Sequence, residues 1–102
     1  MKSDVVKAVF QDELERNRRL VSRYEKELET LPKGAIYKRK IGNHEYLYLN
    51  YREGNKVVSK FLGKNETFDS DELQMQLDKR NEYKQLIKKL KLEQKDLLKA
   101  LK

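Results

Sequence analysis

The chain contains no cysteine and no tryptophan, and only one histidine and one proline. Without cysteine it has neither disulfides nor thiolate metal ligands, which suits a reducing cytoplasm. Its apolar runs fall well short of the roughly 18 residues that a membrane-spanning helix needs. The N-terminal stretch MKSDVVKAVF is too polar for a secretory signal. We therefore expect a cytoplasmic protein with no membrane partner.

The residues that enzymes use for catalysis are also scarce. The one histidine, His44, falls in an expected hairpin turn, and no partner is visible that would activate or orient its ring. The four glycines are spread over turns and do not form a phosphate-binding loop. The acidic residues between Glu66 and Asp78 match a helix start better than a calcium loop. The sequence therefore predicts no catalytic residue, no cofactor and no metal site, and hence no enzyme.

The chain is rich in charge, and the positive excess lies in its middle. Of its 102 residues 40% are charged, and the net charge is +7. Residues 1–32 carry seven basic and seven acidic side chains, residues 33–64 carry eight and two, and residues 65–102 carry nine and eight. Such a basic segment favours nucleic acid or another anionic surface as partner. The alternative is that the net charge only keeps a small protein soluble.

Both ends of the chain have the apolar spacing of long helices. Apolar residues recur in steps of four and three around one polar step in each helix, Asn17 in the first and Gln94 in the second. The apolar positions are Phe10, Leu14, Val21, Tyr24, Leu28 and Leu31, and then Tyr83, Ile87, Leu90, Leu97 and Leu101. We expect the helices to pair as an antiparallel, coiled-coil-like hairpin. Asn17 and Gln94 would either fix its register or reach water at a thin interface.

Capping and breaking residues set the expected bounds of these helices. Ser3 or Asp4 can cap the first helix, residues 1–31, and Pro32 ends it. The second helix spans residues 69–101, and Asp69 with Glu72 has the spacing of a capping box.

Residues 34–63 have the alternation and the turn signals of a three-stranded antiparallel sheet. Gly42-Asn43 and Gly54-Asn55 are two-residue hairpin turns between β-prone runs. The first turn places Lys40 opposite Glu45, a favourable cross-strand charge pair. The other predicted pairs are Ile41 with His44, Arg39 with Tyr46, Tyr37 with Tyr48, Tyr48 with Phe61, Leu49 with Lys60, Tyr51 with Val58 and Glu53 with Lys56. The expected fold class is α+β, helix–sheet–helix in a single domain, residues 1–102.

The alternation divides the sheet into two faces. An aromatic face holds Tyr37, Arg39, Ile41, His44, Tyr46, Tyr48, Val57, Ser59 and Phe61. An aliphatic face holds Ile36, Lys38, Lys40, Leu47, Leu49, Tyr51, Val58, Lys60 and Leu62. Because lysine is almost never fully buried unless it is paired, we expect the aromatic face to pack on the helices. If the aliphatic face is covered instead, four exposed rings would form a platform suited to stacking on single-stranded bases: Tyr37, Tyr46, Tyr48 and Phe61.

The sheet segment resembles a family of small uncharacterised bacterial and phage proteins with the pattern LPxGxI, a basic strand, and YxYLxYREGxKVxSxYLGK. The matching stretches are Leu31–Ile36, Tyr46–Gly54 and Lys56–Lys64, with Ala35 for a usual Ser and Phe61 for a usual Tyr. The resemblance implies a helix–sheet–helix fold in a phage or mobile-element context, in the cytoplasm of a bacterial host cell. It implies no activity.

We therefore expect a small nucleic-acid-binding protein of a phage or mobile element that contacts phosphates through its sheet. The sequence does not decide whether the ligand is DNA or RNA. For Arg52, the alternative to a nucleic-acid contact is a salt bridge with Glu53 or Glu45. The candidate binding residues are basic residues of the strands and turns: Lys33, Lys38, Lys40, Arg52, Lys56, Lys60 and Lys64. One alternative is a phage-encoded inhibitor of a host protein such as a bacterial immune nuclease, an anti-CRISPR-like role. Another is a helical oligomerisation module that forms a homodimer through the helices.

Overall fold

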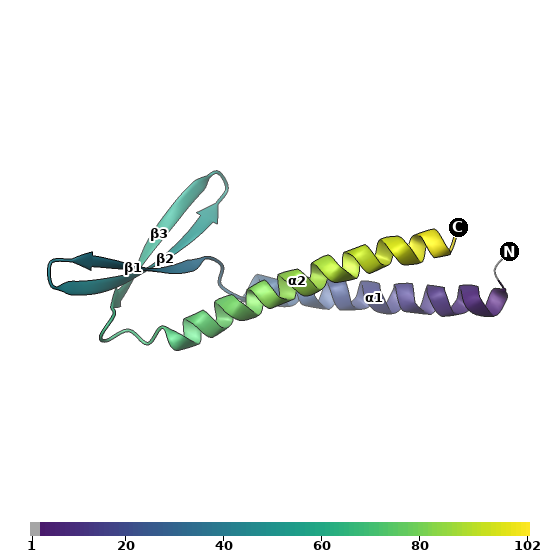
Figure 1. Cartoon of the computed structure of the whole chain (residues 1–102), viewed down its shortest axis with the longest axis horizontal. Helices are drawn as coiled ribbons and strands as arrows, with labels where there is room; N and C mark the ends of the chain where they lie inside the picture. Colours follow the sequence, from purple (N-terminus) through teal and green to yellow (C-terminus); the bar gives the residue numbers. More distant parts are fainter. Residues whose placement is uncertain (1–2) are drawn as a thin grey trace. The chain divides into compact units, whose positions relative to one another are not determined.

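A computed structural model describes residues 3–102. The element order is α1 (Asp4–Thr30), β1 (Ala35–Ile41), β2 (His44–Glu53), β3 (Lys56–Lys64) and α2 (Asp71–Ala100), as Figure 1 shows. The expected α+β class and all five elements are confirmed, with bounds that shift by a few residues. The chain divides into two compact units, and α2 contributes to both. One unit joins the residues up to Thr30 with Asn81–Lys102, and the other is Leu31–Arg80. The single domain expected from the length stays a prediction.

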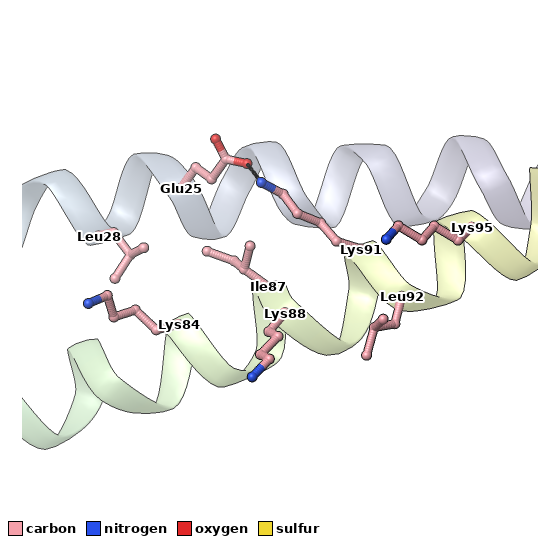
Figure 2. A pocket seen from close by; sticks show the side chains of 8 residues that line it. All are labelled: Glu25, Leu28, Lys84, Ile87, Lys88, Lys91, Leu92 and Lys95. Carbon is pink, nitrogen blue, oxygen red and sulfur yellow. Dashed lines mark ion pairs between the residues drawn. The ribbon is translucent and has the colours of Figure 1, made fainter.

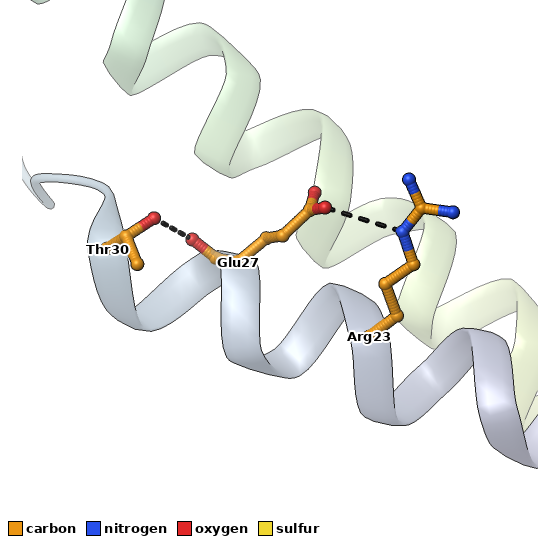
Figure 3. A network of polar contacts seen from close by, with 3 residues as sticks. All are labelled: Arg23, Glu27 and Thr30. Carbon is orange, nitrogen blue, oxygen red and sulfur yellow. Dashed lines mark hydrogen bonds and ion pairs between the residues drawn. The ribbon is translucent and has the colours of Figure 1, made fainter.

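The ends of α1 are closed by local hydrogen bonds. At its start, the backbone N–H of Val6 donates to the Ser3 hydroxyl over 3.2 Å, so Ser3 is the capping residue. At its end, the Thr30 hydroxyl donates to the backbone carbonyl of Glu27 over 2.7 Å. The carboxylate of Glu27 meets Arg23 at 3.5 Å on the same face (Figure 3). Pro32 lies two residues after Thr30, and its ring disfavours helical geometry at Leu31, so the helix ends here.

In the helical unit, α1 and the later part of α2 pack against each other along the predicted seam. The rings of Tyr24 and Tyr83 stack with centroids 5.2 Å apart, and Asn17 donates from its side-chain nitrogen to the carbonyl of Leu90 over 2.8 Å. The earlier contact residue of α1, Asn17, meets the later one of α2, Leu90, and Tyr24 meets Tyr83. The two helices therefore run antiparallel, as expected. Asn17 is only 2% exposed. It is therefore a buried polar step that bonds the partner helix, and it does not reach water.

The start of α2 differs in detail from the expected capping box. The helix begins at Asp71, and the carboxylate of Asp69 accepts a hydrogen bond from the backbone N–H of Asp71 over 3.1 Å. The backbone N–H of Gln74 donates to the Ser70 carbonyl over 2.8 Å, which closes the first helical turn. Asp69 therefore bonds one residue before Glu72, the partner expected from the capping-box spacing, through a turn of the kind that Asp side chains favour.

The sheet has the order β1-β2-β3 and is antiparallel throughout. Every predicted pair is present, including Lys40 with Glu45 and Tyr48 with Phe61. The sequence analysis did not predict a bulge, which lies where Leu47 and Tyr48 of β2 face β3. Leu47 pairs with Gly63 and Tyr48 with Phe61, so Leu62 is the extra residue between them. Beyond the bulge, Lys64 pairs with Tyr46 and shares its face.

The aliphatic face is the covered one, so the expectation that the aromatic face packs on the helices is wrong. Leu47 is 2% exposed, Leu49 is buried, and Leu77 in the α2 segment of the same unit is buried too. Phe68 closes over β3, because a Cβ added to Gly63 would lie 3.4 Å from the Cβ of Phe68. Lysines at the margin of this face stay exposed, since their long stems can lie over apolar surface while the charge reaches water.

Candidate nucleic-acid interface

The exposed side of the sheet is the aromatic face. Tyr37 is 59% and Phe61 56% exposed. Phe61 of β3 contacts two rings of β2, with centroids 5.5 Å from Tyr48 and 6.1 Å from Tyr46. His44 continues the row at 6.4 Å from Tyr46. Aromatic rings from all three strands therefore lie along one open surface, as the alternative in the sequence analysis described.

The register adds three polar residues to this face and gives it a single sign of charge. Asn50 pairs with Ser59, Arg52 with Val57 and Lys64 with Tyr46, so all three share the aromatic face. With Arg39, the face then carries three permanent cations. The two glutamates of strands β1–β3, Glu45 and Glu53, lie on the opposite face. A surface of rings and cations without carboxylates attracts polyanions.

The seven basic residues predicted as the binding site do not form one patch. All are exposed, but four of them lie on the aliphatic face: Lys38, Lys40, Lys56 and Lys60. Lys33 lies in the loop before β1, with its ammonium 5.9 Å from the ring centre of Tyr51. Arg52 and Lys64 belong to the aromatic face.

One of these lysines is engaged with a glutamate. Lys38 approaches Glu45 at 3.6 Å, whereas Lys40 is the directly paired residue. Diagonal neighbours on one face of a sheet are within reach of long side chains. The sequence analysis therefore placed the strands correctly, but it expected Lys40 as the ionic partner of Glu45, where the structure has Lys38.

Two residues of the aromatic face were missing from the predicted site. Arg39 was assigned to this face but left out, because the face was expected to be covered. Asn50 was not considered, although its alternation with Tyr48 would have placed it beside the rings. The position of Lys64 depends on the bulge, for which the glycine inside the third strand, Gly63, was the signal that the sequence analysis did not use.

A shallow hollow of about 210 Å³ lies within the aromatic face. Its lining is Tyr37, Lys38, Arg39, Tyr48, Asn50 and Ser59. The side-chain oxygen of Asn50 is buried there and has no hydrogen-bond partner among the described residues. Few buried polar atoms in proteins lack a partner, so this oxygen requires an explanation.

The helical unit has a separate hollow of about 500 Å³, shown in Figure 2. Leu28, Ile87 and Leu92 supply its apolar lining, and Leu92 is 54% exposed. Four lysines of α2 border it: Lys84, Lys88, Lys91 and Lys95. Lys91 meets Glu25 of α1 at 3.8 Å. The lining therefore combines three apolar side chains with four lysines and one glutamate.

Of three comparisons with known proteins, one finds a match. A family model described as a domain of unknown function, DUF6788, matches residues 10–75, which include the whole sheet. No curated protein and no solved structure matches the chain. Within residues 3–102, no helix is long and apolar enough to cross a membrane. The same residues contain no group of three or more His, Asp or Glu side chains that could hold a metal ion.

Proposed function

The chain belongs to the DUF6788 family, and we propose that it binds single-stranded nucleic acid through the aromatic face of its sheet. The observation that carries the proposal is the open row of rings that includes Tyr37, Tyr48 and Phe61. Each base stacked on an aromatic side chain contributes about 1–3 kcal/mol, and every base has a face that can stack. The resemblance of residues 31–64 to phage and mobile-element proteins supports such an element as the context.

The charges of the same face support contacts to the phosphate backbone. Arg39, Arg52 and Lys64 border the rings without any carboxylate among them on that face. A strand whose bases stack on the rings would bring its phosphates to these cations. The bases of a duplex are stacked on each other and hidden from a flat aromatic surface, so single strands are the preferred ligand.

The test is a salt titration of binding to fluorescently labelled 15-mers of single-stranded DNA, single-stranded RNA and duplex DNA. We expect single strands to bind at low salt, with an affinity that falls steeply as salt rises. The double variant Tyr37→Ala with Phe61→Ala should weaken this binding at least tenfold, because it removes two stacking rings.

The matched control is Met75→Ala, which shortens a 70% exposed apolar side chain on α2, away from the rings. It should bind like the wild type. No binding to single strands at low salt, or equal binding by the double variant and the wild type, would refute the proposal.

A second candidate is a protein partner on the helical unit, as the alternative of a phage-encoded inhibitor requires. It is favoured by the exposed Leu92, which lines the lysine-bordered hollow. An apolar side chain among lysines suits an acidic amphipathic helix. A specific partner from nuclease-treated host lysate should be lost on Leu92→Glu and kept on Tyr37→Ala. The opposite pattern would return the interaction to the sheet.

A further inference from the structure

Small residues flank Asn50, one of the residues that line the hollow in the aromatic face. On the central strand, Asn50 pairs with Ala35 of β1 on one side and with Ser59 of β3 on the other. The next pair on the same face is Tyr37 with Tyr48, two large rings. The hydroxymethyl group of Ser59 and the two tyrosines are part of the lining of the hollow, and so is Asn50.

The amide of Asn50 is not satisfied by the protein. Its oxygen is buried and accepts no hydrogen bond from the described residues. Leaving a buried acceptor without a donor is unfavourable, whereas an apolar side chain of similar shape at the same place would leave nothing unpaired. A ligand that brings an N–H group into the hollow would supply the missing donor once the Asn50 side chain turns its oxygen toward the hollow.

We propose that this hollow is a subsite for one base with an exocyclic amino group, with adenine as the best match, and that Asn50 recognises it. The side-chain oxygen accepts from the amino group, and the side-chain NH₂ donates to the neighbouring ring nitrogen. This is the two-bond pairing by which Asn selects adenine. The inference rests on the proposed function: the rings hold any base, and Asn50 adds a preference at one position.

The experiment compares two labelled single-stranded 15-mers, one of deoxyadenosine and one of 2′-deoxynebularine. Nebularine has the purine ring of adenine and lacks only the amino group, so stacking and backbone charge are closely matched. The wild type should bind the adenine oligomer about tenfold more tightly, the scale of one specific base contact. Asn50→Leu should abolish the preference, so that the two oligomers bind alike. Because nebularine keeps the ring nitrogen that the Asn50 NH₂ group meets, its affinity should fall too, but less than that of the adenine oligomer.

A thermal unfolding curve of Asn50→Leu separates recognition from a structural role. Because the variant removes an unpaired acceptor, its melting temperature should equal or exceed that of the wild type. A melting temperature several degrees lower would assign Asn50 to the fold and overturn the subsite.

The remaining outcomes distinguish the two levels of the proposal. Equal binding of both oligomers by the wild type, or an adenine preference that survives Asn50→Leu, overturns the subsite and leaves the stacking surface in place. No binding of either oligomer by the wild type at low salt overturns the proposed function, and the subsite with it.

Discussion

The two faces of the sheet differ in a way that the count of charges conceals. The aliphatic face has four lysines and two glutamates, yet its centre is buried around Leu47 and Leu49. The aromatic face has fewer cations and no glutamate, yet it is the open one. The comparison shows that a lysine-rich face can still be the inner face, because each lysine needs only its terminal ammonium in water. The proposed function therefore rests on the exposed rings and not on the number of lysines.

The strongest test of this assignment is removal of a buried side chain. Leu47→Ala should lower the free energy of unfolding by about 2–5 kcal/mol, because it deletes buried methyl groups and leaves a cavity. Urea denaturation followed by circular dichroism measures the loss. The control is Val57→Ala on the aromatic face, where Val57 is 68% exposed. This change should alter stability by about 0.5 kcal/mol or less. A large loss in the control and a small one at Leu47 would reverse the two faces.

A second variant tests the cover over the aliphatic face. Gly63 has a φ of 150°, and a side chain there would also press against Phe68. Gly63→Val should therefore cost about 1–3 kcal/mol of stability through strain and displacement of Phe68. Gly42→Asn is the control, since that turn position is open and Asn tolerates its φ of 64°. Equal melting temperatures of the Gly63 variant and the wild type would show that Phe68 does not lie on β3.

Two neighbouring cations on β1 sharpen the comparison in function. Arg39 and Lys40 point to opposite faces. Arg39→Glu should weaken binding of single-stranded DNA about tenfold and reduce the salt dependence by roughly the 0.7 expected for one phosphate contact. Lys40→Glu makes the same change of charge and should weaken binding far less. If the two variants bind alike in the salt titration, the contacts are not confined to the aromatic face.

The smallest effect is expected from the surface ion pair of the aliphatic face. Lys38 and Glu45 are both largely exposed at a separation of 3.6 Å, a setting in which ion pairs contribute about 0–1 kcal/mol. A double-mutant cycle with Lys38→Met and Glu45→Gln should give a coupling below about 0.5 kcal/mol. A cycle with Lys40→Met in place of Lys38→Met decides which lysine is the partner in solution. A larger coupling for Lys40 would favour the partner expected from the register alone.

Much of the fold could be predicted because its signals are local. The two Gly-Asn turns determine which residues face each other, and the resulting pairs agree with the structure from Ile41–His44 to Glu53–Lys56. The helical seam follows from spacing, and Asn17 is the buried polar step in it. The bulge at Leu62 was not predicted, although Gly63 beside it is the kind of residue that marks a bulge inside a strand.

The candidate site was predicted only in part. Arg52 and Lys64 lie on the open face, whereas Lys38, Lys40, Lys56 and Lys60 lie on the other. The wrong expectation about the covered face came from one assumption, that lysines mark the solvent side. The platform of Tyr37, Tyr46, Tyr48 and Phe61 was present as the alternative, and burial decided between the two.

By itself, the sequence determined the elements, their order, the strand register and the division of the sheet into two faces. Each of these depends on residues close together in the chain, through turn geometry, helix breaking and alternation. Only the tertiary structure decided which face is covered, because that depends on side chains such as Phe68 that arrive from beyond the sheet. Leu47 and Leu49 are buried on the covered face, whereas the rings of Tyr37 and Phe61 stay exposed on the other.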